Sequence, residues 1–167
     1  MDLATQTGLA FGPARAVPQV WTVNLGAGKA EAEKFGRAMR MTRACVERYR
    51  PEEIVIEAAV GGPKASSFLH GLVACVRGEA WQHGVPVTMY HQQSIRKHFL
   101  GGNPSKRQFA GSASQQSKQL KALVVNRCRS LGWPVEDDNQ ADACALWDYA
   151  HALRSPAHAL HTVGGLL

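Results

Sequence analysis

The sequence predicts an α/β domain in which helices cover both faces of a mixed sheet. Short apolar runs typical of strands occupy Thr7–Gly12, Val20–Leu25, Ile54–Ile56 and Val85–Tyr90. Stretches with apolar residues at three- and four-residue spacing, which are typical of helices, lie between these runs and after them. Two strands, then helix–strand–helix–strand, then further helices is the order expected of a helix-covered mixed sheet.

The periodic stretches predict five helices. They are residues 29–50, a helix that opens in segment 61–67 and ends near Gln82, a short one within 91–102, one from Ser117 that Gly132 stops, and a last one from about Asn139 to Leu153. The Ser-, Gly-, Gln- and Asn-rich segment 103–116 predicts a mobile loop. We therefore expect one domain over residues 1–153, followed by an irregular tail over residues 154–167.

Composition excludes several classes of protein. A chain of 167 residues with 45% hydrophobic residues is long enough to bury a core, and no apolar run approaches the length of a membrane span. The first residues lack the basic and apolar regions of a signal peptide. The four cysteines are widely spaced and form no C-x-x-C pair, which argues against zinc. We expect a soluble, cytoplasmic protein with no membrane partner.

Charge is unevenly distributed along this chain of net charge +6. No acidic residue lies between Glu79 and Glu136, whereas four acidic residues lie within positions 136–142. The acid-free interval carries Arg96, Lys97, Lys106, Arg107, Lys118, Lys121, Arg127 and Arg129. A one-sign basic stretch beside an acidic cluster indicates a polyanion held near a metal site, and the alternative is a solvated basic face with no partner.

Carboxylates occupy three informative places. Asp2 precedes the first strand, Glu57 directly follows the apolar run Ile54–Ile56, and Asp138 and Asp142 are spaced to lie on one side of the last helix. Converging carboxylates repel one another unless a cation compensates them, and Mg²⁺ or Mn²⁺ prefers such oxygen ligands. The alternatives stay open: Asp138 either caps the helix or binds metal, and Glu57 either pairs with an arginine or binds metal. We expect Glu136 and Asp137 to be solvated loop acids.

Four segments resemble motifs of the RuvC-type Holliday-junction resolvases, which belong to the ribonuclease H-like nuclease superfamily. They are "DLATQTGLAFG", "EIVIEAAVGGPKASSFLHGLVACVRG", "IRKHFLGG" with a downstream "SKQLK", and "DDNQADACAL", in the family's order over nearly the whole chain. The wording of the last motif and the Ser/Gln-rich insert look more like the bacteriophage or prophage branch.

The resemblance implies a ribonuclease H-like fold with a five-stranded mixed sheet, two Mg²⁺ ions that Mn²⁺ can replace, and a homodimer that nicks four-way DNA junctions. It implies metal ligation by Asp2, Glu57 and Asp142, and a scissile phosphate held by Lys118 or Lys121. The Lys and Arg side chains of region 96–129, among them Arg96, Lys97, Lys106 and Arg107, would hold the DNA backbones.

Three positions depart from the family's pattern. One is Val60, three residues past Glu57, where some relatives carry an aromatic residue that wedges into the junction. Asn139 stands where the family often has Asp or His, which favours Asp138 as the fourth ligand. Only Met1 precedes the first aspartate, where the family has several apolar strand residues, so either the start lies upstream or the first strand is short.

The sequence therefore predicts a metal-dependent endodeoxyribonuclease that resolves branched DNA. Two alternatives remain: a related nuclease that cuts RNA–DNA hybrids or flaps, and a branched-DNA-binding protein that has lost catalysis.

Overall fold

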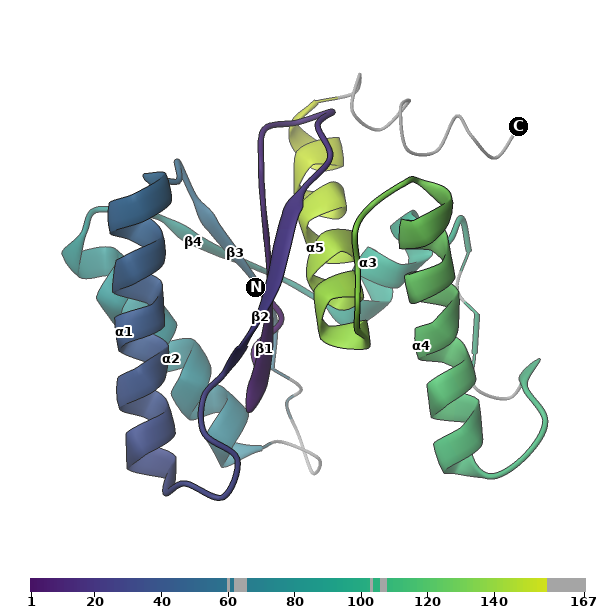
Figure 1. Ribbon diagram of the computed structural model, residues 1–167, viewed down its shortest axis with the longest axis horizontal. Helices are drawn as coiled ribbons and strands as arrows, with labels where there is room; N and C mark the ends of the chain where they lie inside the picture. Colours follow the sequence, from purple (N-terminus) through teal and green to yellow (C-terminus); the bar gives the residue numbers. More distant parts are fainter. Residues whose placement is uncertain (60, 62–65, 103, 106–107, 156–167) are drawn as a thin grey trace.

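The computed structural model describes residues 1–59, 61, 66–102, 104–105 and 108–155. Strands β1 (Gln6–Phe11) and β2 (Gln19–Asn24) form an antiparallel pair in which Gln6 lies opposite Asn24 and Phe11 opposite Gln19. Strands β3 (Ile54–Glu57) and β4 (Val87–Tyr90) form a parallel pair. The α/β class is confirmed, since helices pack on both sides of these strands (Figure 1).

The expected five-stranded sheet is not present in the described residues, which form two separate two-stranded sheets. The segment Met1–Leu3 lies between them. Asp2 forms an isolated antiparallel bridge with Gly8 of β1, and the Met1 nitrogen donates a hydrogen bond to the Val55 carbonyl of β3 at 2.7 Å. These few bonds join the two pairs but are too few to make the segment a strand.

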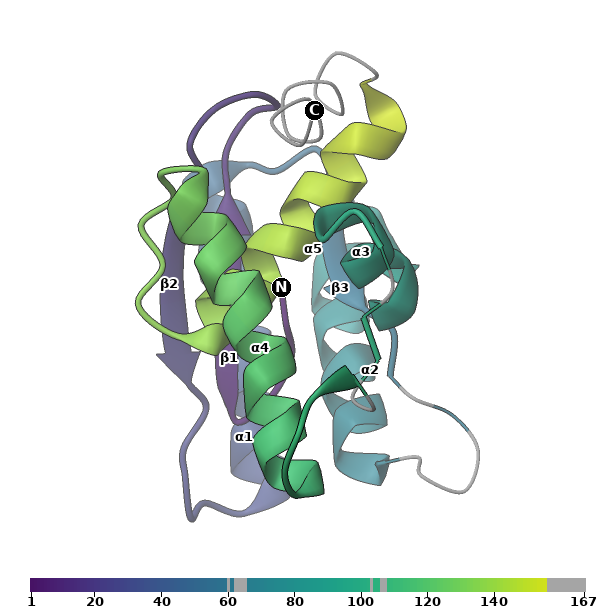
Figure 2. The same cartoon turned by 90° about the vertical axis from the view of Figure 1, so that its right-hand side faces the viewer.

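Two layers of helices enclose the strands (Figures 1 and 2). Helices α1 (Glu31–Tyr49) and α2 (Ser67–Gln82) pack together on one side. Helices α3 (Gln92–Phe99), α4 (Ala113–Ser130) and α5 (Asp138–Arg154) lie on the other. Each layer has its own apolar core. The first includes Leu9, Leu25, Ile56, Leu72 and Val76, and the second includes Val124, Cys128, Trp133, Leu146 and Trp147.

Capping explains where two helices start earlier than the sequence predicted. Helix α4 begins inside the expected loop, because Ser112 and Gln115 form a reciprocal capping box that starts the helix. Helix α5 begins at Asp138, and Asp137 caps it by accepting a 2.8 Å hydrogen bond from the Gln140 amide. Asp137 is therefore not the solvated loop acid that we expected. The helix also extends to Arg154, and residues 156–167 lie outside the described part of the chain.

None of the helices in the described segments is both long enough and apolar enough to cross a membrane.

Gly8 is the point at which β1 presses against the start of α5. A Cβ atom at Gly8 would lie 1.9 Å from the carbonyl oxygen of Asn139, far inside van der Waals contact. We expect Gly8→Ala to lower the Tm by roughly 5–10 °C, because backbone cannot yield as a flexible side chain does. Thermal unfolding followed by circular dichroism measures this.

Gly78→Ala provides the matched control. Gly78 lies within α2 and a Cβ there would meet nothing within 4 Å, so the substitution should leave the Tm unchanged or raise it through better helix propensity. An unchanged Tm for Gly8→Ala would show that β1 and α5 are not in this close contact.

Candidate functional site

Four carboxylates from three separate places in the sequence lie near one another at one edge of the strands. Asp2 comes from the segment bridged to β1, and Glu57 is the last residue of β3. Asp138 and Asp142 lie one turn apart at the start of α5. Asp2 and Asp142 each raise the pKa of Glu57, and Asp2 raises that of Asp142, so the three side chains share one electrostatic environment.

The start of α5 is fixed from two sides, which sets the positions of its two aspartates. The Asp137 carboxylate accepts a 2.8 Å hydrogen bond from the Thr22 hydroxyl of β2 in addition to capping the helix. The side chain of Gln140, which is buried, accepts a hydrogen bond from the Glu136 amide at 3.0 Å. The contact between Gly8 and Asn139 holds the same turn against β1.

Burial raises the pKa of three of these carboxyl groups. The pKa of Glu57 rises to about 7, chiefly from burial and then from the charges of Asp2 and Asp142. The pKa of Asp142 rises to about 6, again chiefly from burial and then from Asp2. Burial likewise raises the pKa of Asp2. The side chains therefore retain protons that ordinary carboxyl groups would lose.

Asp2, Glu57, Asp138 and Asp142 form an acidic cluster, and two cationic side chains from α3 and α4 lie beside it. Lys121 of α4 forms a hydrogen-bonded ion pair with Asp138, which lowers the pKa of that carboxyl group. Burial opposes the charge of Lys121, but Asp138, Asp142 and Asp2 together raise its pKa. Arg96 of α3 lies with a guanidinium nitrogen 3.9 Å from Asp142 Oδ1. Both cations partly offset the repulsion among the acids.

The donor set fits a hard divalent cation in its chemistry. Oxygen donors with raised pKa values, gathered by opposite ends of the chain, are what a Mg²⁺ ion would stabilise in their charged form. As placed, however, no three acidic, histidine or cysteine side chains of the described residues converge closely enough to ligate one ion. Asp138 and Asp142 instead face Lys121 and Arg96, so ligation would require these side chains to turn from their present partners.

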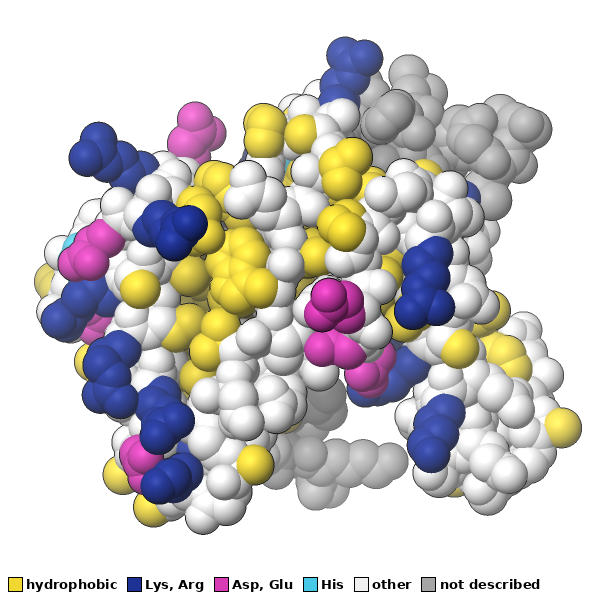
Figure 3. Space-filling model, in the orientation of Figure 1, with side chains coloured by type: hydrophobic (Ala, Val, Ile, Leu, Met, Phe, Trp, Pro, Cys, Tyr) yellow, Lys and Arg dark blue, Asp and Glu magenta, His cyan; other side chains and the backbone are white. Residues whose placement is uncertain are grey.

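The basic residues predicted to bind DNA lie in different environments in the structure. Lys121 and Arg96 lie in the cluster, and the side chain of Arg96 is only 15% exposed, unlike a side chain free on the surface. Lys97 and Lys118 are exposed, and Lys118 lies one turn before Lys121 on α4. Lys106 and Arg107 lie outside the described residues. The face drawn in Figure 3 carries further Lys and Arg side chains over α1 and over α4.

Gln92 is a site residue that the sequence reasoning missed. It opens α3 directly after β4, and its amide nitrogen lies 3.5 Å from Glu57 Oε2. Because β3 and β4 are parallel, the residues that follow both strands meet at the same edge. The signal was therefore available: a polar residue follows the second of two neighbouring parallel strands.

Comparison with known proteins identifies the class of fold. Neither a protein-family model nor a curated protein matches the sequence. The fold is RuvC-like: in the part of the chain that the structure describes, five helices enclose short strands of an α/β domain.

Two solved structures from Thermus thermophilus show this likeness. The RuvC structure superposes with a TM-score of 0.62 and 17% identity, covering 92% of each chain. RuvC in complex with a Holliday junction substrate has a TM-score of 0.62 and 19% identity, covering 92% of this chain and 91% of the other.

The raised pKa values predict how stability depends on pH. Between the ordinary pKa of 4.5 and the folded value of about 7, the folded protein holds the Glu57 proton more tightly than the unfolded chain does. The free energy of unfolding should therefore fall as pH rises through this range, by roughly 1–3 kcal/mol from Glu57 alone. Urea unfolding at several pH values in the presence of a chelator measures it.

Glu57→Gln removes the titrating group and should flatten this part of the profile. Glu47→Gln, at an exposed position of α1, should leave the profile as it is. Identical slopes for wild type and Glu57→Gln would contradict the raised pKa.

Proposed function

We propose that this protein is a metal-dependent endodeoxyribonuclease that resolves four-way or other branched DNA junctions by phosphodiester hydrolysis. The shared electrostatic environment of Asp2, Glu57 and Asp142 near the carboxyl end of β3, with Lys121 beside them, carries the proposal. The likeness to a RuvC solved with a Holliday junction supports the choice of substrate. We place the protein, on the wording of its last motif, in the bacteriophage or prophage branch of the family.

Two Mg²⁺ ions, replaceable by Mn²⁺, would be held by Asp2, Glu57 and Asp142 with Asp138 as the fourth ligand. When bound, such a pair lowers the pKa of an attacking water and offsets charge on the phosphate and the leaving oxygen. Glu57, whose pKa is raised to about 7, would have to lose its proton to act as a ligand. Arg96, whose guanidinium lies 3.9 Å from Asp142 in the structure, would remain near the site and limit its negative charge after Asp142 turned to a metal ion.

Lys121 has two partners in this scheme. In the structure it neutralises Asp138. If Asp138 held a metal ion instead, the Lys121 ammonium would be available to hold a non-bridging oxygen of the scissile phosphate. Lys118, one turn away and exposed, would meet a neighbouring phosphate or share this role.

The DNA would be held through its backbone rather than its bases. Arg96, Lys97, Lys106, Arg107, Lys118 and Lys121 belong to an interval of the chain with no acidic residue, which suits phosphate contacts. A four-way junction offers two equivalent strands, and we propose that a homodimer nicks both. Light scattering of the purified protein tests the dimer.

Cleavage of a labelled four-way junction tests the activity. We expect nicking with Mg²⁺ or Mn²⁺ and none with Ca²⁺. Glu57→Gln and Asp142→Asn should each reduce the rate on the order of 1,000-fold, because each removes a charged ligand worth several kcal/mol of transition-state stabilisation. Glu136→Gln, at an exposed acid beside the same helix, should cleave as wild type does.

Flap and RNA–DNA hybrid substrates, run in the same assay, separate the alternatives. Faster cutting of a hybrid than of the junction would replace junction resolution with a related nuclease activity. Tight junction binding without nicking under any ion would make the protein an inactive binder.

The two lysines of α4 should differ in their effects. Lys121→Met should slow cleavage by about 100-fold while weakening junction binding in Ca²⁺ only slightly, because its charge acts at the reacting phosphate. Lys118→Ala should weaken binding and reduce the salt slope by about one, as for a single phosphate contact. Arg40→Ala on exposed α1 serves as the control. Equal cleavage by wild type and Lys121→Met would remove Lys121 from the mechanism.

A further inference from the structure

Helix α3 carries a histidine–aspartate pair that the proposed cleavage scheme does not use. The Nε2 atom of His98 lies 2.9 Å from the Oδ2 atom of Asp148 on α5, and only 1% of the Asp148 side chain is exposed. A buried carboxylate is costly unless it is hydrogen-bonded, and a carboxylate can only accept, so Nε2 of His98 is the donor. The His98 ring also packs against Tyr149, with 5.4 Å between the ring centroids. The pair therefore joins α3 to the C-terminal half of α5.

The position of α3 matters because this helix carries Arg96 into the acidic cluster. Helix α3 has only eight residues. A helix shorter than about 12 residues is marginal by itself, so tertiary contacts decide where it lies. Ile95 and Phe99 bury one side of α3 in the second core. Apolar contacts are non-directional, so directional contacts must set the position of α3 along α5.

Two such contacts reach in opposite directions along α5. Arg96 lies 3.9 Å from Asp142, whereas His98 bonds to Asp148. The two aspartates are about 9 Å apart along α5, but Arg96 and His98 are only about 3 Å apart along α3 and about 200° apart around it. Arg96 and His98 therefore leave α3 on opposite sides, one toward the start of α5 and the other toward its end. A shift of α3 in either direction would lengthen one of the two contacts.

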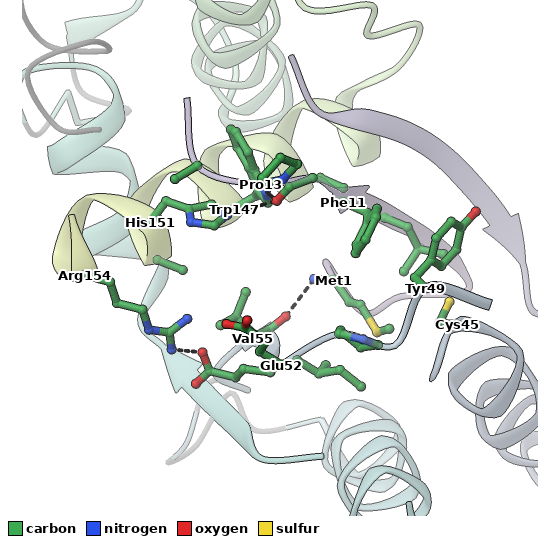
Figure 4. A pocket seen from close by; sticks show the side chains of 18 of the residues that line it. Met1, Phe11, Pro13, Cys45, Tyr49, Glu52, Val55, Trp147, His151 and Arg154 are labelled. Carbon is green, nitrogen blue, oxygen red and sulfur yellow. Dashed lines mark hydrogen bonds and ion pairs between the residues drawn. The ribbon is translucent and has the colours of Figure 1, made fainter. Parts of the chain in front are cut away.

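Helix α5 is itself held by the strands. On the side that lines the pocket in Figure 4, the Trp147 indole donates a 3.0 Å hydrogen bond to the Gly12 carbonyl, and Arg154 forms an ion pair with Glu53. The cap formed by Asp137 fixes the start of the helix. Of the two helices, α3 is therefore the one that would move.

We propose that the His98–Asp148 pair is a positioning device for the candidate site: it fixes α3 along α5 and so holds the Arg96 guanidinium beside Asp142. The Nε atom of Arg96 is buried and has no hydrogen-bond partner among the described residues, so no bond from this atom holds the side chain in place. At 3.9 Å, the contact with Asp142 is longer than a hydrogen bond and does not fix the guanidinium alone. The effect of the pair on cleavage rests on the proposed function, whereas its effect on Arg96 does not.

The Nε–H resonance of Arg96 in heteronuclear NMR spectra tests the proposal without metal or DNA, and Arg96→Lys assigns it by removing it. In the wild type this proton should exchange slowly with water, because the group is buried. His98→Phe combined with Asp148→Leu replaces both partners by apolar side chains, which should keep the Tm near that of the wild type. The Arg96 proton should nevertheless exchange at least about 10-fold faster, because apolar contacts do not hold α3 in register.

Three further variants separate positioning from stability. Asp148→Asn keeps an acceptor for His98 and should keep the slow exchange at Arg96, even where loss of the charge lowers the Tm. His98→Asn, whose side chain is too short to reach Asp148, should give the faster exchange of the double variant and replaces that variant if it does not fold. His83→Phe is the matched control, because His83 lies 3.3 Å from the buried Glu79 in the other helix layer. It should lower the Tm without changing the Arg96 resonance.

Exchange at the wild-type rate in both the double variant and His98→Asn would overturn the proposal. So would faster exchange in every variant with a lowered Tm, His83→Phe included, since that would be a general effect of stability. In the junction assay the double variant should cleave roughly 10- to 100-fold more slowly than the wild type, and Asp148→Asn should stay near the wild-type rate. Failure of the wild type itself to cleave would remove the proposed function and leave the NMR result to decide the positioning role.

Discussion

The structure depends on how several carboxylates are kept together in a place that water scarcely reaches. Burial is the main cause of the raised pKa values of Asp2, Glu57 and Asp142, and the charge of Asp2 adds to it at both Glu57 and Asp142. The charges of Lys121 and Arg96 oppose part of this rise in pKa. The carboxyl groups therefore still hold their protons to a higher pH than ordinary carboxyl groups do. Each charged group comes from a different element, so the balance exists only when the strands, α3, α4 and α5 are assembled. The site is thus a consequence of the whole fold.

The segment Met1–Leu3 couples the site to the sheets. It carries Asp2 into the acidic cluster, and its few hydrogen bonds are what joins β1 to β3. Leu3, which is buried in the first core, holds the segment from one side. Stability and the geometry of the site are connected at this point of the molecule.

The sequence predicted the order and type of every helix and strand, because periodicity and strand-like runs are local properties. It also predicted the placement of Glu57 and of the Asp138–Asp142 pair, since the end of a strand and a helical turn are local too. It missed Gln92 and the burial of Arg96, which depend on how α3 packs after β4. It placed the cap of α5 one residue late, because any of several neighbouring acids suits that role. The family resemblance implied a five-stranded sheet. The segment Met1–Leu3, which lies between the two strand pairs in space, instead forms only an isolated bridge with β1.

Fold likeness at 17–19% identity supplies a scaffold, and the chemistry must be argued from the site. The decisive property here is the balance of charge. If the cluster were only a structural ion-pair network, two cations would suffice for two aspartates, and Glu57 and Asp2 would have no reason to be buried beside them. The pKa of Glu57 is raised to about 7, chiefly by burial and then by the charges of Asp2 and Asp142, and Arg96 only partly opposes this rise. In the function proposed above, divalent cations and a phosphate backbone would meet at this edge, and the cations would supply the positive charge that the described residues lack.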